Sequence, residues 1–222
     1  MSYKLFGLYP KPKRFPIVQK LPKKPYLTNE ETKLLLSKKV IIEEKMDGKP
    51  ALIIGENYIL FCEDLKQKHS IHYHIPARFA IFDILDKKRN YLVDLNTKIE
   101  IYKEIKFMGY YQKTPFLLYP NNKKIYPDSL FLIPILESGF FKMEELPNLI
   151  GYSHYAKDPK VYMEGIVVKT YFSSFLSESN RAGKIVRQEF SNQISIHYRR
   201  KKAEYNIIDP NKKEYNNYLI RY

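Results

Sequence analysis

The sequence contains no tryptophan, a single cysteine and no long uninterrupted apolar run. With Cys62 alone, no disulfide can form within the chain, which fits a reducing compartment. No stretch reaches the roughly 18 apolar residues of a membrane-spanning helix. Residues 1–16 also lack the apolar segment of a secretory signal. We therefore expect a soluble, cytoplasmic protein with no membrane partner.

Acidic residues are scarce relative to basic ones. The chain has 24 Asp and Glu against 38 Lys and Arg, a formal net charge of +14. A surplus of this size favours a polyanionic partner such as a nucleic acid, because Lys and Arg gain free energy by neutralising phosphates and releasing counterions. A lysine-rich solvated surface would give the same count, so charge alone does not separate the two interpretations.

The length and the apolar content favour one large domain with a small appendage. The chain has 222 residues, of which 44% are hydrophobic, enough for a sizeable core. We expect one domain over residues 1–200 and a short basic tail over 201–222. Prolines and basic residues make residues 1–27 an extended arm, since proline excludes a long helix. The basic run 199–202 precedes the tail and is either solvated or in contact with a nucleic-acid backbone.

Short strands outnumber helices in the predicted pattern. A capping signal at Thr28, with acidic residues in the next turn, predicts a helix over 28–38. Helices are also predicted over 97–108, 146–151 and 172–179. Apolar runs bounded by turn residues predict strands at 40–43, 51–54, 58–61, 79–85, 130–136, 165–171 and 182–187. Helices and strands do not alternate regularly, which favours the α+β class.

The stretch 44–48 has the composition of a nucleophilic lysine site. At an ordinary pKa near 10.4, only about one lysine in 2,500 is neutral at pH 7, so a nucleophilic Lys45 needs a site that lowers its pKa. The predicted strand before Lys45 would fix its position. Asp47 and Gly48 would turn the chain so that the backbone could lie against a ligand. Taken alone, the same residues would fit a surface turn.

Further blocks with suitable chemistry follow in order along the chain. One places a carboxylate at a strand end, one is an aromatic strand, one begins with an acid, and one is a strand with two cations. These blocks are residues 61–65, 78–84, 163–169 and 182–187.

Together the blocks resemble the motifs of covalent nucleotidyltransferases, which comprise ATP-dependent RNA and DNA ligases and mRNA capping enzymes. The resemblance covers about residues 8–200. Five motifs in one order are far more specific than any of them alone. Residues 63–73 and Tyr9-Pro10-Lys11 are similar to segments of the RNA-ligase branch. The matching blocks are 45–48 (motif I), 62–64 (motif III), 79–84 (motif IIIa), 164–169 (motif IV) and 184–187 (motif V).

The resemblance implies a role for each site residue. Lys45 would form a lysyl-AMP phosphoramidate, and Lys184 would contact the α-phosphate and stabilise charge in the transition state. Phe82 would stack on the adenine, with Phe79 as the alternative. Glu63 would bind the ribose hydroxyls or a metal ion, and Glu164 would bind the metal, Mg²⁺ or Mn²⁺. The implied nucleotide contacts are Glu44, Lys45, Asp47, Gly48, Glu63, Phe82, Glu164, Lys184 and Arg187, with Arg187 on either a phosphate or the nucleic acid.

The resemblance also implies a fold and an activity. The family fold has two antiparallel sheets flanked by helices, with the nucleotide in the groove between them. The enzyme would use ATP to join a 5′-phosphate to a 3′-hydroxyl of an RNA or DNA strand. Too few residues follow Lys184 for an oligonucleotide-binding barrel, which favours a minimal RNA ligase. The alternatives are a minimal DNA ligase and a degenerate ligase-like domain that only binds nucleic acid.

Two features depart from the family pattern or invite another interpretation. Lys49 and Pro50 follow motif I, and no arginine occurs between Lys45 and Arg78. An arginine soon after motif I is usual in the family, so either a loop is deleted here or another cation, such as Lys49 or Lys68, takes the place of the arginine. The neighbouring histidines 69, 72 and 74 are either a metal site or surface and substrate contacts. We favour the second interpretation, because a zinc site needs further ligands.

Overall fold

The structure is a computed structural model of the chain. It describes residues 9, 11–16, 25–107, 116–119, 121–178, 180–190 and 203–215. Most of the predicted N-terminal arm and the basic run 199–202 lie outside the described residues.

A five-stranded sheet carries Lys45 at the end of one of its strands. Its order is β1 (Lys13–Arg14), β13 (Ala182–Val186), β12 (Gly165–Thr170), β2 (Val40–Glu44) and β11 (Ile135–Gly139). β2 is fully buried and runs antiparallel to both of its neighbours. β1 pairs with β13 in parallel, with Arg14 opposite Lys184. The sheet therefore brings the segments around motifs I, IV and V side by side.

A seven-stranded sheet forms the second layer. It follows the order β10 (Leu130–Leu132), β6 (Phe79–Asp86), β4 (Tyr58–Asp64), β3 (Lys49–Ile54), β8 (Phe116–Tyr119) and β9 (Lys123–Ile125), with β7 (Tyr91–Leu92) paired to β6. β10 and β6 are parallel. A third, two-stranded parallel sheet joins β14 (Ile207–Ile208) to β5 (His74–Ile75). The α+β class is confirmed. Both large sheets are mainly antiparallel, as expected, but each includes one parallel edge pair, β1–β13 and β10–β6.

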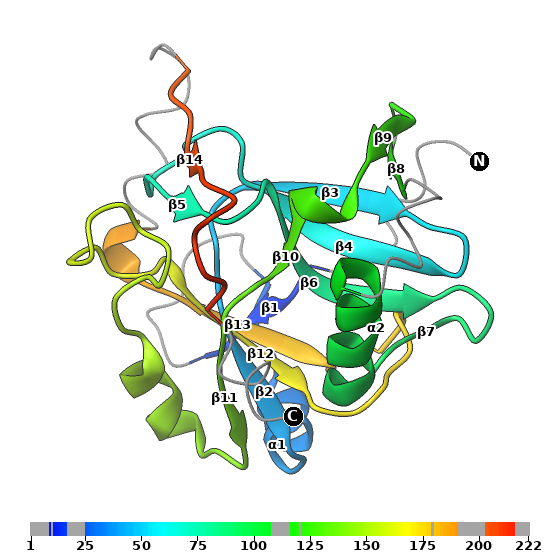
Figure 1. Ribbon diagram of the computed structural model, residues 1–222. Helices are drawn as coiled ribbons and strands as arrows, with labels where there is room; N and C mark the ends of the chain where they lie inside the picture. Colours follow the sequence, from blue (N-terminus) through cyan, green and yellow to red (C-terminus); the bar gives the residue numbers. More distant parts are fainter. Residues whose placement is uncertain are drawn as a thin grey trace.

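The helices pack against the two large sheets, and α2 shares a core with residues of both (Figure 1). α2 (Leu95–Phe107) packs Ile99, Tyr102 and Ile105 into the core beside the seven-stranded sheet. α1 (Asn29–Leu36) and the 3₁₀ helix η2 (Met143–Leu149) pack on the five-stranded sheet through Leu35 and Leu146. A short 3₁₀ helix, η1 (Pro127–Ser129), precedes β10.

Local sequence signals predicted some elements well. Thr28 forms a capping box with Glu31, and α1 ends two residues before the predicted limit. β3 and β4 form the expected hairpin around Gly55. The predicted helix over 172–179 is wrong for its described residues: Ser174 instead makes an isolated bridge to Leu92.

The predicted strand over 130–136 is two strands in different sheets. β10 ends at Leu132 and β11 begins at Ile135, with Pro134 between them. Proline has no backbone N–H to donate to a neighbouring strand, so the chain leaves one sheet here and enters the other. The Pro134 carbonyl accepts a hydrogen bond from the Glu44 backbone N–H at 2.9 Å. This crossing thus supports the strand end that carries Lys45.

Residues 203–215 run back across the large sheets. Asn206 donates to the Leu65 carbonyl at 2.7 Å and accepts from the Tyr73 N–H at 2.7 Å. Glu214 accepts a hydrogen bond from Tyr102 of α2. The proposed boundary after residue 200 stays a prediction. Among the described helices, none has the length and apolar character needed to span a membrane.

Candidate active site

Lys45 is held by its backbone at the point where the five-stranded sheet ends. It follows β2, and its N–H donates to the Gly165 carbonyl at the start of β12 at 2.9 Å. Gly165 is tightly enclosed: a Cβ there would lie 2.0 Å from the Ile185 carbonyl oxygen of β13. The three strands therefore meet without room for a side chain at position 165. This close packing fixes the backbone of Lys45.

The Lys45 ammonium contacts the Glu164 carboxylate, which immediately precedes β12. The Glu164 side chain is only 5% exposed and that of Lys45 is 22% exposed. Glu63, at the end of β4, approaches from the other large sheet and interacts with the charges of both residues. Residues from three predicted motifs thus converge from two sheets.

Both carboxylates are short of compensating positive charge. Burial raises the pKa of Glu63 to about 7, although the nearby Lys45 charge opposes the shift. Burial likewise raises the pKa of Glu164, again against the effect of Lys45. A divalent cation would relieve this deficit, and carboxylate oxygens are the ligands that Mg²⁺ and Mn²⁺ prefer. Glu63 and Glu164 therefore fit the metal-binding role expected of them.

Lys184 brings positive charge to the same region. Burial lowers its pKa to about 8, and the charges of Lys45 and Arg14 add to the shift. Arg14 is its direct neighbour in the β1–β13 register, and the charge of Lys11 also contributes. Sequence reasoning identified Lys184 but missed Arg14, because the pairing of β1 with β13 has no local signal.

Asp47 and Gly48 shape the turn after Lys45. The Asp47 carboxylate accepts a hydrogen bond from the Ser70 N–H at 2.8 Å, and the Asp47 N–H donates to the Tyr73 hydroxyl at 2.9 Å. A Cβ at Gly48 would lie 2.8 Å from the Asp64 carbonyl oxygen and from the Glu63 Cγ atom. The glycine is required here because β4 passes so close. A direct contact of either residue with a nucleotide stays a prediction.

The Glu44 side chain is held by residues outside the predicted motifs. It is fully buried and accepts hydrogen bonds from the Ser153 hydroxyl at 2.5 Å and from the His154 N–H at 3.1 Å. A nucleotide contact of Glu44 stays a prediction. The side chain instead anchors the segment 153–154 beside Lys45.

Phe82 is the half-buried aromatic residue of β6, whereas Phe79 is fully buried in the core. The Phe82 ring has Tyr9 at 5.1 Å in an edge arrangement and Phe61 at 6.4 Å between centroids. This arrangement favours Phe82 over Phe79 for the predicted base-stacking role, which stays a prediction. Tyr9, in the segment that resembles RNA ligases, lies beside this ring.

A network of buried charges lies next to Phe82, and sequence reasoning did not identify it. Lys98 of α2 contacts Glu43 at 2.5 Å, and Lys169 of β12 contacts Glu43 at 2.6 Å and Asp83 at 3.0 Å. Arg181 is 3.6 Å from Asp83. The only local signal for this network is the alternation of side chains along β2, which places Glu43 and Glu44 on opposite faces of the sheet.

The two lysines proposed to replace the missing arginine have other contacts. Lys49 donates to the Gln67 side chain at 3.2 Å, and Lys68 pairs with Glu204. Arg78 makes a bidentate pair with Asp64, at 2.8 and 2.6 Å. Arg187 donates through Nε to the Met163 carbonyl at 2.8 Å. By position, Arg14 is thus the arginine that the strand register sets beside Lys184.

The histidines do not come together. His69 lies 3.7 Å from Asp47, and His74 lies 3.2 Å from Asp209. Within the described part of the chain, no group of three or more His, Cys, Asp and Glu side chains is arranged to hold a metal ion. A metal held by Glu63 and Glu164 would therefore take its other ligands from phosphate and water.

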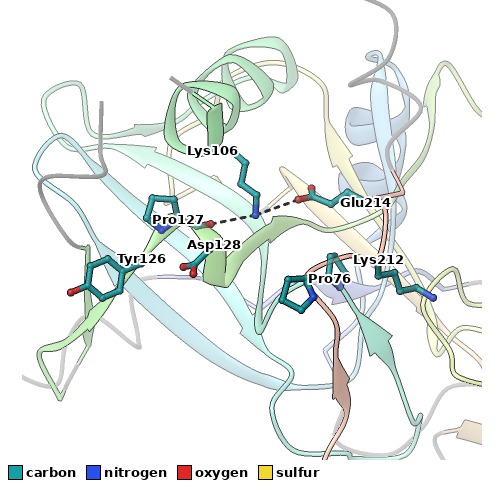
Figure 2. A pocket seen from close by; sticks show the side chains of 8 residues that line it. Pro76, Lys106, Tyr126, Pro127, Asp128, Lys212 and Glu214 are labelled. Carbon is teal, nitrogen blue, oxygen red and sulfur yellow. Dashed lines mark hydrogen bonds and ion pairs between the residues drawn. The ribbon is translucent and has the colours of Figure 1, made fainter. Parts of the chain in front are cut away.

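A pocket of about 540 Å³ lies away from Lys45 (Figure 2). Lys106, at its wall, donates to the Leu130 carbonyl at 2.8 Å and lies 3.6 Å from Glu214. Its lining contains none of the predicted site residues.

Comparison with known proteins assigns the family. A family model described as RNA ligase matches residues 50–186, and the chain therefore belongs to the RNA ligase family. The match begins five residues after Lys45, so it does not test the assignment of residues 45–48 to motif I. No curated protein matches the sequence.

Two solved structures of the Naegleria gruberi RNA ligase have a similar fold. One, a variant with ATP and Mn, gives a TM-score of 0.50 at 10% identity and covers 75% of this chain and 55% of that one. The other, with PPi, gives 0.51 at 13% identity and covers 82% and 60%. At this identity the likeness concerns the fold alone, and the chain spans little more than half the length of those ligases.

Proposed function

We propose that the chain is an ATP-dependent RNA ligase in which Lys45 becomes covalently attached to AMP. The observation that carries this proposal is the contact of Lys45 with Glu164, with Glu63 and Lys184 close enough for their charges to interact. Membership of the RNA ligase family supports RNA as the substrate.

The reaction would proceed in three steps. The Lys45 amine attacks the α-phosphorus of ATP, a P–N bond forms, and the bond to the β-phosphate breaks to release pyrophosphate. The 5′-phosphate of a strand then displaces Lys45 from the AMP. Finally, a 3′-hydroxyl attacks that 5′-phosphate, the phosphodiester forms and AMP leaves. The first step requires a Lys45 amine that has lost its proton.

The surrounding residues would each support the first step. Glu164 would orient the Lys45 side chain, and Lys184 with Arg14 would bind the phosphates and stabilise the negative charge that develops. Glu63 and Glu164 would hold Mg²⁺ or Mn²⁺, which, when bound, would neutralise phosphate charge. The Phe82 face would receive the adenine.

Self-adenylation tests the proposal directly. The protein is incubated with ATP labelled at the α-phosphate and Mg²⁺, then separated on a denaturing gel. We expect a labelled band that is lost in Lys45→Ala and kept in Lys38→Ala, an exposed lysine just before β2. No band with the unaltered chain, or a band that survives Lys45→Ala, would contradict the proposal. Labelling by GTP but not ATP would indicate capping chemistry.

Strand joining tests the choice of nucleic acid. RNA and DNA strands of one sequence, each with a 5′-phosphate and a 3′-hydroxyl end, are offered in parallel. We expect joining of the RNA ends. Efficient joining of DNA alone would identify a minimal DNA ligase, and RNA binding without any label on Lys45 would identify a degenerate, binding-only domain.

A further inference from the structure

Two exposed tyrosines form a preassembled pair close to the candidate site. Tyr152 and Tyr162 are 52% and 43% exposed, and their ring centroids lie 4.5 Å apart. An isolated antiparallel bridge joins their backbones. Paired aromatic rings that are held in place and open to solvent offer a ready surface for a ligand with flat faces.

Arg187 connects this pair to the residues around Lys45. Its guanidinium carbon lies 5.3 Å from the Tyr162 ring centroid, and its Nε donates to the Met163 carbonyl at 2.8 Å. Its backbone N–H donates to the Glu164 carbonyl at 3.0 Å. Tyr162 is thus two residues from the carboxylate that contacts Lys45.

The other tyrosine is tied to the site through the segment that follows it. Ser153 and His154, the next two residues, bind the carboxylate of Glu44, which precedes Lys45. The aromatic pair is therefore positioned by contacts on both sides of the nucleophile's strand end.

We propose that Tyr152, Tyr162 and Arg187 form a surface on which unpaired nucleotides beside the reactive RNA end stack. The proposal rests on the proposed function and specifies part of its substrate. Aromatic rings and guanidinium planes are the groups on which proteins stack splayed RNA bases, and they do so with little regard to sequence.

The charge of the surface fits a strand rather than another protein. The connection between the two tyrosines carries Lys157 and Lys160, both exposed, against the single acid Asp158. Arg187 adds a further positive charge, with Glu189 at 4.0 Å from it. Cations interleaved with aromatic rings allow backbone and bases to be bound together. Bases paired in a continuous duplex could not present their faces here, so the surface selects ends with unpaired nucleotides.

Affinity for RNA with an unpaired end provides the first test. Binding is measured without ATP by fluorescence anisotropy, on a 5′-phosphorylated single strand and on a fully paired nicked duplex. We expect Tyr152→Ala/Tyr162→Ala to bind the single strand at least tenfold more weakly, with little change for the duplex. Tyr152→Phe/Tyr162→Phe should restore binding, because it keeps both rings. Tyr126→Ala, which removes another tyrosine of 50% exposure, should bind like the unaltered chain.

Self-adenylation of the same variants separates this inference from the proposed function. The alanine pair should label with α-labelled ATP within about twofold of the unaltered chain, because neither tyrosine contacts ATP in the proposed reaction. If the unaltered chain fails to label, the ligase proposal fails while the binding comparison still stands. If the unaltered chain labels, but single-stranded RNA binds the unaltered chain and the alanine pair equally, the proposed stacking surface is wrong.

Photocrosslinking of the unaltered protein avoids the risk that an alanine variant misfolds. RNA strands carrying 5-iodouridine at the last or penultimate nucleotide of either end are irradiated, and the linked peptides are identified by mass spectrometry. We expect links to Tyr152 or Tyr162. Links only to other residues would overturn the proposal. The proposal would also be overturned if Tyr152→Ala/Tyr162→Ala converted a dimer in solution into a monomer, because the two tyrosines would then join two protein chains.

Discussion

Arg14 of β1 lies directly opposite Lys184 of β13 in a parallel register. Residues paired in this way point to the same face of a sheet, so the register sets the guanidinium beside the ammonium. Their mutual repulsion contributes to the lowered pKa of Lys184. Two cations held together at some cost in free energy indicate a site for an anion. The N-terminal segment thereby places an arginine beside Lys184, whereas the stretch between Lys45 and Arg78 contains none.

Replacing Arg14 should impair the use of ATP more than the joining of an activated end. We expect Arg14→Ala to raise the KM for ATP in self-adenylation by about tenfold or more, because a charge-assisted contact to phosphate is lost. Sealing of an RNA end that already carries AMP should change much less, since it involves no triphosphate. Arg14→Lys should recover part of the loss.

Lys13→Ala is the matched control for this prediction. It removes the same charge from the same short strand, but Lys13 pairs with Glu31 of α1 at 2.6 Å. Equal effects of Lys13→Ala and Arg14→Ala would show that Arg14 contributes only its positive charge and makes no specific contact with phosphate.

The pH dependence of self-adenylation should reflect two groups of opposite sign. Glu63 must be ionised to bind metal, and its pKa is about 7, so activity should rise as the pH increases through 7. Lys184 must be protonated to bind phosphate, and its pKa is about 8, so activity should fall above pH 8. We expect a bell-shaped profile of kcat/KM, measured at limiting Mg²⁺, which reports the free enzyme.

Two variants test which group causes each limb of that pH profile. Lys184→Arg should move the alkaline limb to higher pH, because a guanidinium keeps its proton. Glu63→Gln should lower activity throughout the pH range. An alkaline limb unchanged in Lys184→Arg would show that another group is responsible for it.

The sequence predicted what depends on neighbours in the chain and missed what depends on distant pairing. The capping box at Thr28 and the hairpin at Gly55 are local, and both form as expected. The apolar run 130–136 looks continuous, but Pro134 lets it cross between sheets, which only their tertiary arrangement decides. In the candidate site, the order of the motifs pointed to Lys45, Glu63, Glu164 and Lys184, whose charges interact in the structure. The partners of the Glu44 carboxylate and the position of Arg14 beside Lys184 depend on tertiary packing, which the spacing of residues in the sequence does not reveal.

The buried charges around Glu43 should matter greatly for stability. Lys98→Met removes one of two lysines that contact this carboxylate, and both side chains of the Lys98–Glu43 pair are almost inaccessible. Breaking a buried pair by removing one partner costs about 3–5 kcal/mol, since the other charge remains buried. We expect a loss of about 3 kcal/mol in the free energy of unfolding, measured with urea.

Lys103→Met offers the comparison on the same helix. Lys103 pairs with the exposed Glu100 at 3.5 Å, a contact worth less than about 1 kcal/mol. A double variant, Lys98→Met with Glu43→Gln, should regain little of the lost stability, because Lys169 and Arg181 then share the single carboxylate of Asp83. Similar losses in Lys98→Met and Lys103→Met would refute a special contribution of the buried network.

Gly165 should tolerate no side chain. In Gly165→Ala the new Cβ would lie 2.0 Å from the Ile185 carbonyl oxygen, and the obstacle is backbone of the paired strand β13, which cannot turn aside as a side chain can. Gly165 also accepts the Lys45 N–H, so any shift of β12 displaces both Lys45 and Glu164. We expect a loss of about 1–3 kcal/mol in urea unfolding together with strongly reduced self-adenylation. Gly151→Ala, where a Cβ would meet nothing within 4 Å, should leave both measurements unchanged. Normal labelling by Gly165→Ala would show that the position of Lys45 does not depend on this close approach of the strands.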